Sequence, residues 1–231
     1  TDFINCRRGI NFSKGSSTNI QLMSGEFSNL NSTDTAIVYR PESFSFESMV
    51  ISGNSWNATG ATISGFDFSR PDGRDANAYI EGNTGSEDRK PHCDINIVNN
   101  TSVTNCTNAN VWYKANWTNT SSFTISWIIQ DNKIIYLPQK SRNVVIIITG
   151  NVMVNASGRV ITVGIVKNGN TSKRYGETTL RISSANQPFQ FSTVIYLQDV
   201  SHNDYLEFYC TSKNSGDALT FQDLNWFVNS L

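Results

Sequence analysis

The sequence predicts an all-β chain in two parts, a short parallel β-helix over residues 1–110 and an antiparallel sandwich or jelly roll over residues 111–231. Short alternating apolar segments recur up to about residue 110, and each runs into Gly or Asn. Beyond that point the strand-like runs are longer and are separated by turn signals. No segment has a convincing helical period, so we expect very little helix.

The first part repeats one pattern, an apolar segment followed by a corner. The segments are GINF, NIQLMSGEF, AIVYR, FSFESMVISGN, ATISGFDF, NAYIEGN and DINIVNN, and the phrase ISG begins at both Ile51 and Ile63. Gly25, Gly53 and Gly82 follow the strongest segments at nearly equal spacings. That spacing is close to one coil of a parallel β-helix, in which Gly and Asn suit the corners because they adopt left-handed backbone angles at little cost.

A set of antiparallel hairpins is the alternative interpretation of residues 1–110. Hairpins would be marked by two-residue Asn-Gly or Asp-Gly turns between the strands. Asp72-Gly73 is the clear case, and few others connect these segments. The β-helix is therefore the favoured interpretation, with apolar side chains stacked between successive rungs.

Eight longer runs follow a transition segment rich in Trp and Asn, NVWYKANWTNTSS at 110–122. They are FTISWII, KIIYLP, RNVVIIITGNVMVN, RVITVGIVKNG, ETTLRIS, FQFSTVIYLQ, DYLEFYCTS and LTFQDLNWFVN. Residues 156–158 are predicted to close a hairpin, and residues 167–170 begin a longer loop. Trp127 and Trp226 lie inside strong strands and are predicted core residues. Runs of this length and spacing favour a sandwich or jelly roll.

The run DYLEFYC has two faces of different character. Strand periodicity separates Tyr205, Glu207 and Tyr209 from Leu206, Phe208 and Cys210. The apolar face is predicted to join the core. The aromatic and polar face is a candidate subunit contact.

Composition and charge exclude several classes of function. The net charge is −1, so the chain has no general attraction to nucleic acid or to an anionic membrane. Charged residues make up 16%, and Ser, Thr, Asn and Gly take their place, as in turns and polar sheet faces. No apolar run approaches the roughly 20 residues of a membrane helix. The start at Thr1, without an initiator methionine or a signal peptide, leads us to expect a fragment of a longer chain.

Four cysteines, Cys6, Cys93, Cys106 and Cys210, are too scattered for a disulfide framework and form no CxxC pair. We expect free, packed thiols, no metal site and no cofactor, which suits a reducing cytoplasm. Ten Asn-x-Ser/Thr tripeptides also occur, and a Ser- and Thr-rich chain produces several by chance. A secreted glycoprotein therefore stays open as a weaker alternative.

A β-helix of polar-rich rungs that leads into a compact jelly roll resembles the distal part of a bacteriophage tailspike or appendage protein. The rung phrases at 51–54, 80–83 and 97–100 carry the first half of this likeness. The stretch from 160 to 230 resembles the tumour-necrosis-factor-like jelly rolls at the tips of viral fibres and spikes. The alternating strand pair before SGD and the apolar C-terminal strand LNWFV carry most of this likeness.

The resemblance implies a homotrimer with a short right-handed parallel β-helix stem followed by an antiparallel jelly-roll tip. It implies a protein of the virion, in the tail appendage, that is made in the host cytoplasm. Such tips register the trimer, bind a host-surface glycan or protein, or do both. The resemblance is architectural and brings no catalytic signature with it.

Tailspikes are often glycan hydrolases or lyases, so paired carboxylates matter. Glycosidases place two carboxyl groups about 5 to 10 Å apart. If ATISGFDF and NAYIEGN form neighbouring rungs, Asp67 and Glu81 could approach one another. Solvated carboxylates paired with nearby Arg and Lys are the favoured interpretation, so both residues are weak catalytic candidates.

Two further loops hold polar clusters. Asp72, Asp75 and Asn77 in PDGRDAN could bind calcium through oxygen ligands, although a plain turn is favoured because the EF-hand order of ligands is absent. His202 lies near Asp199 and Asp204, but no serine elbow accompanies them. A loop histidine without catalytic work is the favoured interpretation.

Aromatic and basic residues supply the candidate receptor site. Trp112, Tyr113 and Trp117 form either a plug over the open end of the β-helix or a platform on which sugar rings stack. Lys173, Arg174 and Tyr175 could meet an acidic sugar or a partner subunit, against the plainer interpretation of a solvated basic turn.

These observations lead to a trimeric viral spike tip that attaches to a host receptor, with a glycan as the expected receptor class. The alternative is a glycan depolymerase with carboxylates in the β-helix or between subunits. We expect no nucleic-acid partner and no membrane insertion.

Overall fold

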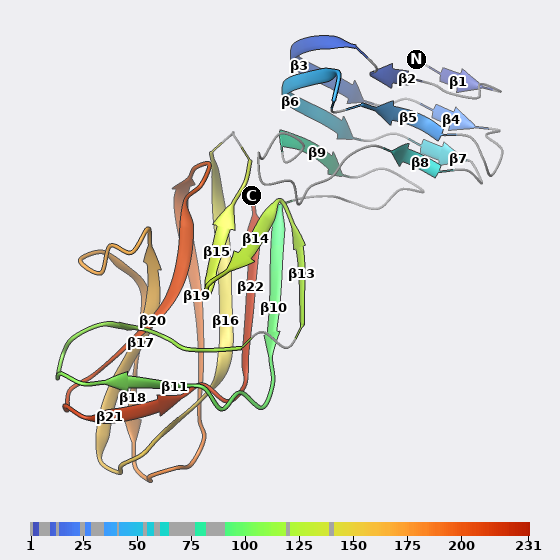
Figure 1. The fold of residues 1–231 in the computed structure, drawn as a ribbon. Coiled ribbons are helices and arrows are strands. Elements are labelled where there is room, and N and C mark those ends of the chain that lie inside the picture. The colour runs from blue at the N-terminus through green and yellow to red at the C-terminus, as the bar shows by residue number, and fades with distance from the viewer. Residues whose placement is uncertain are drawn as a thin grey trace. The chain divides into compact units, whose positions relative to one another are not determined.

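The computed structural model is an all-β protein whose chain divides into two compact units (Figure 1). The first unit is Thr1–Pro91 with Leu137–Ser141, and the second is His92–Tyr136 with Arg142–Leu231. The structure describes residues 2–4, 10–12, 14–23, 26–28, 35–40, 42–52, 55–57, 61–64, 77–81, 91–118, 121–138 and 141–231. No α-helix occurs in these ranges, and hence none that could cross a membrane.

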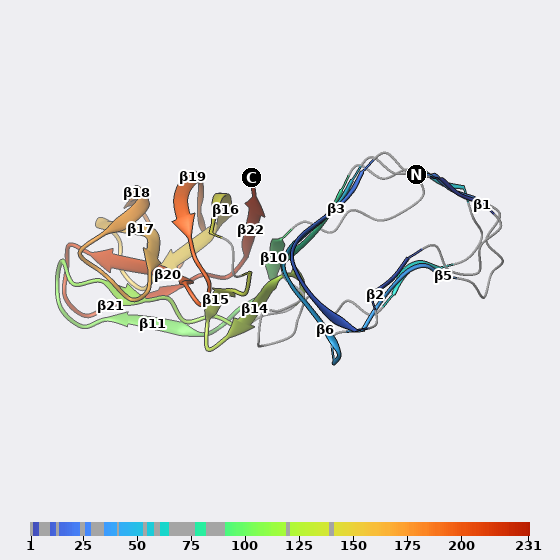
Figure 2. The same cartoon turned by 90° about the horizontal axis from the view of Figure 1, so that it is seen from above.

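The described residues of the first unit form three small parallel sheets of three strands each. One contains β1 (Asp2–Ile4), β4 (Glu26–Ser28) and β7 (Ser55–Asn57); another contains β2 (Ile10–Phe12), β5 (Thr35–Tyr39) and β8 (Ala61–Ser64); the third contains β3 (Gly15–Met23), β6 (Phe44–Ser52) and β9 (Ala78–Glu81). Each strand from β1 to β6 pairs with the strand three places later in the chain. Seen from above, the strands of each sheet lie over one another (Figure 2).

The register of the third sheet explains the repeated phrases of the sequence. Leu22 pairs with Ile51, and Ile51 pairs with Ile80, so the two steps along the chain are of equal length. Ile51 and Ile80 are fully buried, so like residues stack in the interior, as predicted. The other two sheets repeat at similar steps. Because all described pairs are parallel, the hairpin alternative is excluded for these strands.

The second unit is a sandwich of two antiparallel sheets. The first sheet runs β13 (Ser121–Ile125), β10 (His92–Ile97), β22 (Leu224–Ser230), β16 (Arg142–Val154) and β19 (Phe189–Val200), and it is extended from β16 by β21 (Asp217–Thr220) and β11 (Val103–Cys106). The second sheet runs β14 (Trp127–Gln130), β15 (Lys133–Tyr136), β20 (Tyr205–Ser212), β17 (Arg159–Lys167) and β18 (Arg174–Ile182), and β12 (Tyr113–Lys114) also pairs with β20.

The strands of the sandwich pair as a set of nested hairpins. β10 pairs with β22, β15 with β20, β16 with β19, and β17 with β18. From the outermost pair to the innermost, successive pairs lie by turns in the first and the second sheet. This is the topology of a jelly roll. The jelly roll expected from the sequence is present.

Alternating side chains of both sheets fill the core. Phe191 of the first sheet stacks on Phe208 of the second, with ring centroids 5.9 Å apart, and Phe208 also contacts Trp226 at 6.4 Å. Trp127 and Trp226 are fully buried, as predicted from their strands. The chain passes between the sheets at Ser126, whose φ of 61° separates β13 from β14 within one predicted run.

The structure differs from the sequence-based predictions in one boundary, one strand and one connection. The chain divides between Pro91 and His92, ahead of the predicted boundary at residue 110. DINIVNN looks like another rung, yet it forms β10 and pairs antiparallel with β13 and β22. An apolar alternating run has the same pattern in either setting, so its partner strand decides. Similarly, residues 156–158 join β16 to β17 in opposite sheets and close no hairpin.

Candidate binding surfaces of the second unit

The outer side of β20 carries an aromatic and charged surface. Leu206, Phe208 and Cys210 are fully buried in the core, so Tyr205, Glu207 and Tyr209 point outward, as the sequence predicts. We call the set Lys114, Lys133, Tyr205, Glu207 and Tyr209 the polar-aromatic face. Lys133 Nζ lies 4.5 Å from the centroid of the Tyr205 ring, a cation–π contact.

A buried ion pair holds the centre of this face. Glu207 is only 3% exposed, although it points away from the core. Its Oε1 lies 3.0 Å from Lys114 Nζ, which also donates a hydrogen bond to the backbone oxygen of Asp131. Burial, followed by the charge of Glu207, raises the pKa of Tyr209, so its phenol stays protonated at neutral pH. The face therefore offers neutral rings around a compensated charge pair.

The structure brings together two of the predicted receptor residues from distant parts of the chain. The guanidinium of Arg174 lies 4.8 Å from the Trp112 ring centroid. Arg174 Nε also pairs with Glu177 Oε1 at 2.9 Å, and Arg174 Nη1 donates a hydrogen bond to the backbone oxygen of Thr171. The charge of Arg174 is thus already compensated, which weakens its case as an acidic-sugar ligand.

The other predicted aromatic and basic residues have structural roles of different kinds. Trp117 is 4% exposed, and within the described part of the chain its Nε1 has no hydrogen-bond partner, so it is a core residue and no accessible platform for a sugar. Tyr113 Oη lies 2.7 Å from Thr107 Oγ1 and accepts a hydrogen bond from Asn108 N at 2.9 Å. Lys173 Nζ lies 5.5 Å above the Tyr175 ring, and Tyr175 packs against the core.

A polar groove of about 570 Å³ lies beside β11 and β12. It is lined by Val103, Thr104, Asn105, Tyr113, Lys114, Asn116, Asp131 and Asn132. The sequence pointed to Tyr113 alone among these residues. Asn105 and Asn116 each begin an Asn-x-Ser/Thr tripeptide in the sequence. That pattern indicates a possible glycosylation site and does not indicate that they line a groove. Only the fold brings β11 next to the turn between β14 and β15.

The first sheet presents an exposed apolar face on its outer side. Phe227 pairs with Ile147, and Ile147 pairs with Val194, so the three lie in one row across the sheet. Val194, Phe123 and Tyr196 are 67%, 59% and 52% exposed. We call Phe123, Ile147, Val194, Tyr196 and Phe227 the apolar face. Asp94 of β10 separates Phe123 from the row of Phe227, Ile147 and Val194. Exposed apolar side chains grouped in this way are a candidate interaction site.

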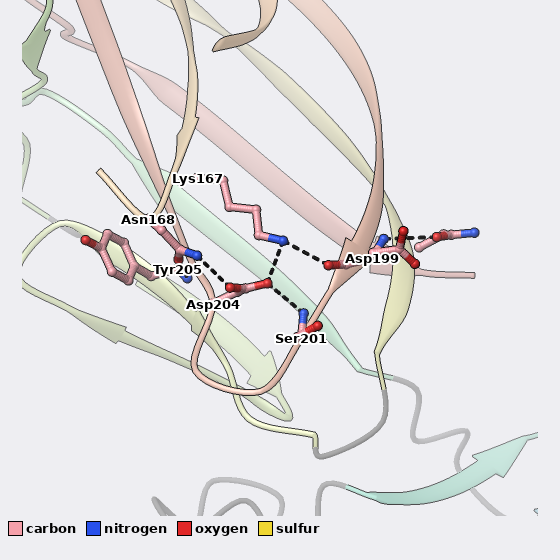
Figure 3. A network of polar contacts seen from close by, with 7 residues as sticks. Lys167, Asn168, Asp199, Ser201, Asp204 and Tyr205 are labelled. Carbon is pink, nitrogen blue, oxygen red and sulfur yellow. Dashed lines mark hydrogen bonds and ion pairs between the residues drawn. The ribbon is translucent and has the colours of Figure 1, made fainter. Parts of the chain in front are cut away.

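The turn between β19 and β20 is held by one carboxylate, as Figure 3 shows. Asp204 Oδ2 lies 2.6 Å from Lys167 Nζ and accepts a hydrogen bond from Ser201 N at 2.7 Å. Asp204 Oδ1 accepts a further bond from Asn168 Nδ2 at 2.6 Å. Lys167 Nζ also donates to Asp199 O at 2.8 Å.

This network explains the cluster of Asp199, His202 and Asp204 in the sequence. Burial alone would raise the pKa of Asp204, but hydrogen bonds from Asn168, Lys167 and Ser201, with the charge of Lys167, outweigh it and lower the pKa. A carboxylate held ionised by three donors is a poor proton carrier at neutral pH. Asp204 therefore fixes this turn to the end of β17.

The predicted acidic sites fall mostly outside the described residues. Asp67, Asp72 and Asp75 lie there, and of Glu81 only the backbone is described, paired with Ser52 in β9. Asn77 is buried where β9 begins. Within the described ranges no group of three His, Cys, Asp or Glu side chains is placed to hold a metal ion.

The three described cysteines, Cys93, Cys106 and Cys210, are free thiols and are fully buried in the sandwich core. Burial, with a smaller effect of Asp94, raises the pKa of Cys93 well above its usual range. A hydrogen bond with Cys106, together with burial, raises the pKa of Cys210 as well. The same hydrogen bond lowers the pKa of Cys106. Cys93 and Cys210 are therefore protonated packing residues.

Comparison with known proteins finds likeness of structure alone. No protein-family model and no curated protein matches the chain. Murine APRIL is similar over 60% of this chain and 98% of its own, at 10% identity and a TM-score of 0.41. The PRD1 vertex protein P5 is similar over 63% and 99%, at 14% identity and a TM-score of 0.41.

A carbohydrate-binding module of Cellvibrio mixtus lichenase 5A, solved with cellotriose, is similar over 60% of this chain and 96% of its own. Its identity is 13% and its TM-score 0.27. Likeness at these levels carries no argument about what this chain binds.

Proposed function

We propose that this chain forms the distal part of a viral spike or fibre, assembles as a homotrimer, and attaches the virion to a glycan receptor on the host surface. The observation that carries the proposal is the succession, along one chain, of parallel strands that repeat at steps of 24 to 29 residues and an antiparallel jelly roll. The first suits an elongated stem and the second a compact tip, which is the architecture that the sequence resembles.

The stem of this proposal is a right-handed parallel β-helix. Three parallel strands per repeat, each paired with the strand three places on, support a chain that winds around a common axis. Connections between parallel strands are almost always right-handed, because a right-twisted strand packs back onto its sheet only that way.

The apolar face of the jelly roll supports assembly with further copies of the chain. Val194, Phe123 and Tyr196 are each more than half exposed, and Val194, Ile147 and Phe227 form one apolar row across the first sheet. Leaving such a surface in water is unfavourable by about 25 cal/mol for every Å² that a partner would cover. A second copy is the partner that is always present at matching concentration.

Light scattering on the purified chain tests the assembly. We expect a mass of about three times 25.7 kDa, and a lower mass for Val194→Asp because a charge would be buried in the interface. Val111→Asp is the matched control, since Val111 is 44% exposed and outside the apolar face. A stable monomer at micromolar concentration would rule out the trimer.

Glycan binding tests the attachment. The intact trimer should bind one class of host-surface glycan reversibly and without releasing fragments. Release of short fragments from a long polysaccharide would instead favour the depolymerase, with Asp67 and Glu81 as the first residues to replace. No binding to any host surface or glycan would refute the attachment function.

A further inference from the structure

The groove beside β11 and β12 has unused hydrogen-bonding groups. The side chains of Asn105, Asp131 and Asn132 make no hydrogen bond or ion pair within the described part of the chain, whereas most polar side chains around them are engaged. Asn116 gives its Nδ2 only a long contact of 3.4 Å to Val103 O. The amides can donate and accept, and the carboxylate accepts.

The walls of the groove are held in place by hydrogen bonds and an ion pair. Asn116 N donates to Thr104 Oγ1 at 2.7 Å, which ties the segment after β12 to β11. The ion pair with Glu207 holds Lys114, and Thr107 with Asn108 holds the Tyr113 hydroxyl. A ligand would therefore meet a preformed surface and lose little free energy in ordering it.

The charges around the groove favour a neutral ligand. Among the described residues that line the groove, Lys114 is the one cation, and its charge is compensated by Glu207 at 3.0 Å. Asp131 leaves a carboxylate without a counter-ion among the described residues. An acidic sugar would be repelled here, unlike at a site with a free cation.

The remaining surface suits the shape of a sugar ring. Val103 is 42% exposed and the Tyr113 ring is half-buried, so apolar surface lies among the amides. A pyranose has an apolar C–H face and hydroxyl groups around its edge, and hydroxyls both donate and accept. The volume of about 570 Å³ lies within the range of about 300–1,000 Å³ of small-molecule sites.

We propose that this groove binds a neutral sugar residue of the receptor glycan, through Asn105, Asn116, Asp131 and Asn132. The proposal rests on the attachment function proposed above and moves its contact site away from Trp117 and Arg174. The inferred ligand class is a neutral hexose or N-acetylhexosamine, with uronic and sialic acids excluded by charge.

Saturation-transfer NMR on the intact trimer tests the groove with methyl glycosides of glucose, galactose, mannose and N-acetylglucosamine. Methyl glucuronide and the methyl glycoside of N-acetylneuraminic acid are the acidic comparison. We expect millimolar binding of at least one neutral glycoside and none of the acidic pair. Asn105→Ala and Asn132→Gly should each weaken binding about fivefold or more, since each removes a hydrogen-bonding amide.

The variants are chosen to leave the fold unchanged. Asn132 has a φ of 55°, which Gly adopts without strain. Asn214→Ala is the control, because Asn214 is an exposed turn residue outside the groove. Equal thermal melting of all variants confirms that binding, and not folding, is measured.

Three outcomes would overturn the proposal: no neutral glycoside binds, acidic glycosides bind as well, or both groove variants bind like the unmodified chain. The attachment function fails separately. If the doubly substituted trimer, Asn105→Ala with Asn132→Gly, binds host cells as well as the unmodified trimer does, the groove is wrong and attachment stands. If the unmodified trimer binds no host cell, attachment itself fails.

Discussion

Single polar residues on the loops of the sandwich stabilise the fold through hydrogen bonds and ion pairs, and Asp204 is the clearest case. It accepts hydrogen bonds from Asn168 and Ser201 and pairs with Lys167, which ties the turn after β19 to the end of β17 (Figure 3). In the sequence the same residue stands beside His202 and resembles part of an acid–base set. Lys167 and Asn168 come from a distant strand end, so these contacts cannot be seen in the sequence.

Replacing Asp204 by Asn should lower the free energy of unfolding by about 1–3 kcal/mol at pH 7, because charge-assisted hydrogen bonds are lost and an amide then faces Asn168. The folded-state pKa is lowered, so this contribution is present above the ordinary value of 3.8 and is lost as the pH falls through the lowered value. Urea unfolding of both proteins from pH 7 to pH 2 measures the difference.

Asp199→Asn is the matched control. It removes the same charge at the end of β19, next to the same turn, and Asn tolerates the φ of 52° at this position. The control should change stability by less than about 0.5 kcal/mol. A difference between Asp204→Asn and the unmodified protein that persists unchanged at pH 2 would contradict the assigned role.

Where β18 of the second sheet meets β19 of the first, the backbone of Gly176 lies close to the side chain of Ile195. Gly176 in β18 has a φ of 61°, and a Cβ built there would lie 2.2 Å from Cγ1 of Ile195 in β19. Ile195 is buried, so it has little room to move. The two sheets can therefore meet here only because Gly176 has no side chain. β18 pairs with β17 in the second sheet, and β19 pairs with β16 in the first.

Gly176→Ala should lower the free energy of unfolding by about 2–4 kcal/mol, combining the strain of positive φ with overpacking. Gly158→Ala isolates the first effect, because Gly158 has a φ of 69° and an added Cβ would meet nothing within 4 Å. It should cost about 1 kcal/mol. Thermal or urea unfolding gives both values, and equal losses for the two variants would refute the clash.

A second substitution separates the clash from other causes. Ile195→Ala creates space beside Gly176, so the double variant Gly176→Ala with Ile195→Ala should lose less stability than the sum of the two single variants. Strictly additive losses would mean that Ile195 does not oppose the new methyl group.

Across the entire chain, the two units are stabilised by different kinds of packing. The first depends on stacking of like residues between parallel strands, as at Leu22, Ile51 and Ile80. The second has one continuous core to which both sheets contribute. Cys93, Cys106 and Cys210 all lie in that core, so their reactivity reports on the second unit alone.

In a Cys6→Ser background, the three thiols should react with a thiol reagent only when the second unit unfolds. Burial and raised pKa values leave Cys93 and Cys210 unreactive at pH 8. We expect all three to become reactive in one cooperative step as denaturant rises, measured by mass spectrometry after short labelling. Labelling of one thiol well before the others would show that the sandwich opens in parts.

Most of the fold could be predicted because strand patterns are local. Alternation assigned the two faces of DYLEFYC, the buried Trp127 and Trp226, and the strands that form β16 to β20. The even spacing of Gly25, Gly53 and Gly82 predicted the parallel repeat that links β3, β6 and β9. Each of these properties belongs to one segment or to its repetition, so composition and periodicity determine it.

The partner of each strand, and the polar residues that meet, are set by packing of the folded chain. DINIVNN looks like a rung but pairs with β13 and β22, and Trp117 looks like a platform but is buried. The groove unites residues of β11, of β12 and of a turn after β14, and Trp112 meets Arg174 from a distant part of the chain. Contacts between distant segments depend on the packing of the whole sandwich, and no local pattern in the sequence encodes them.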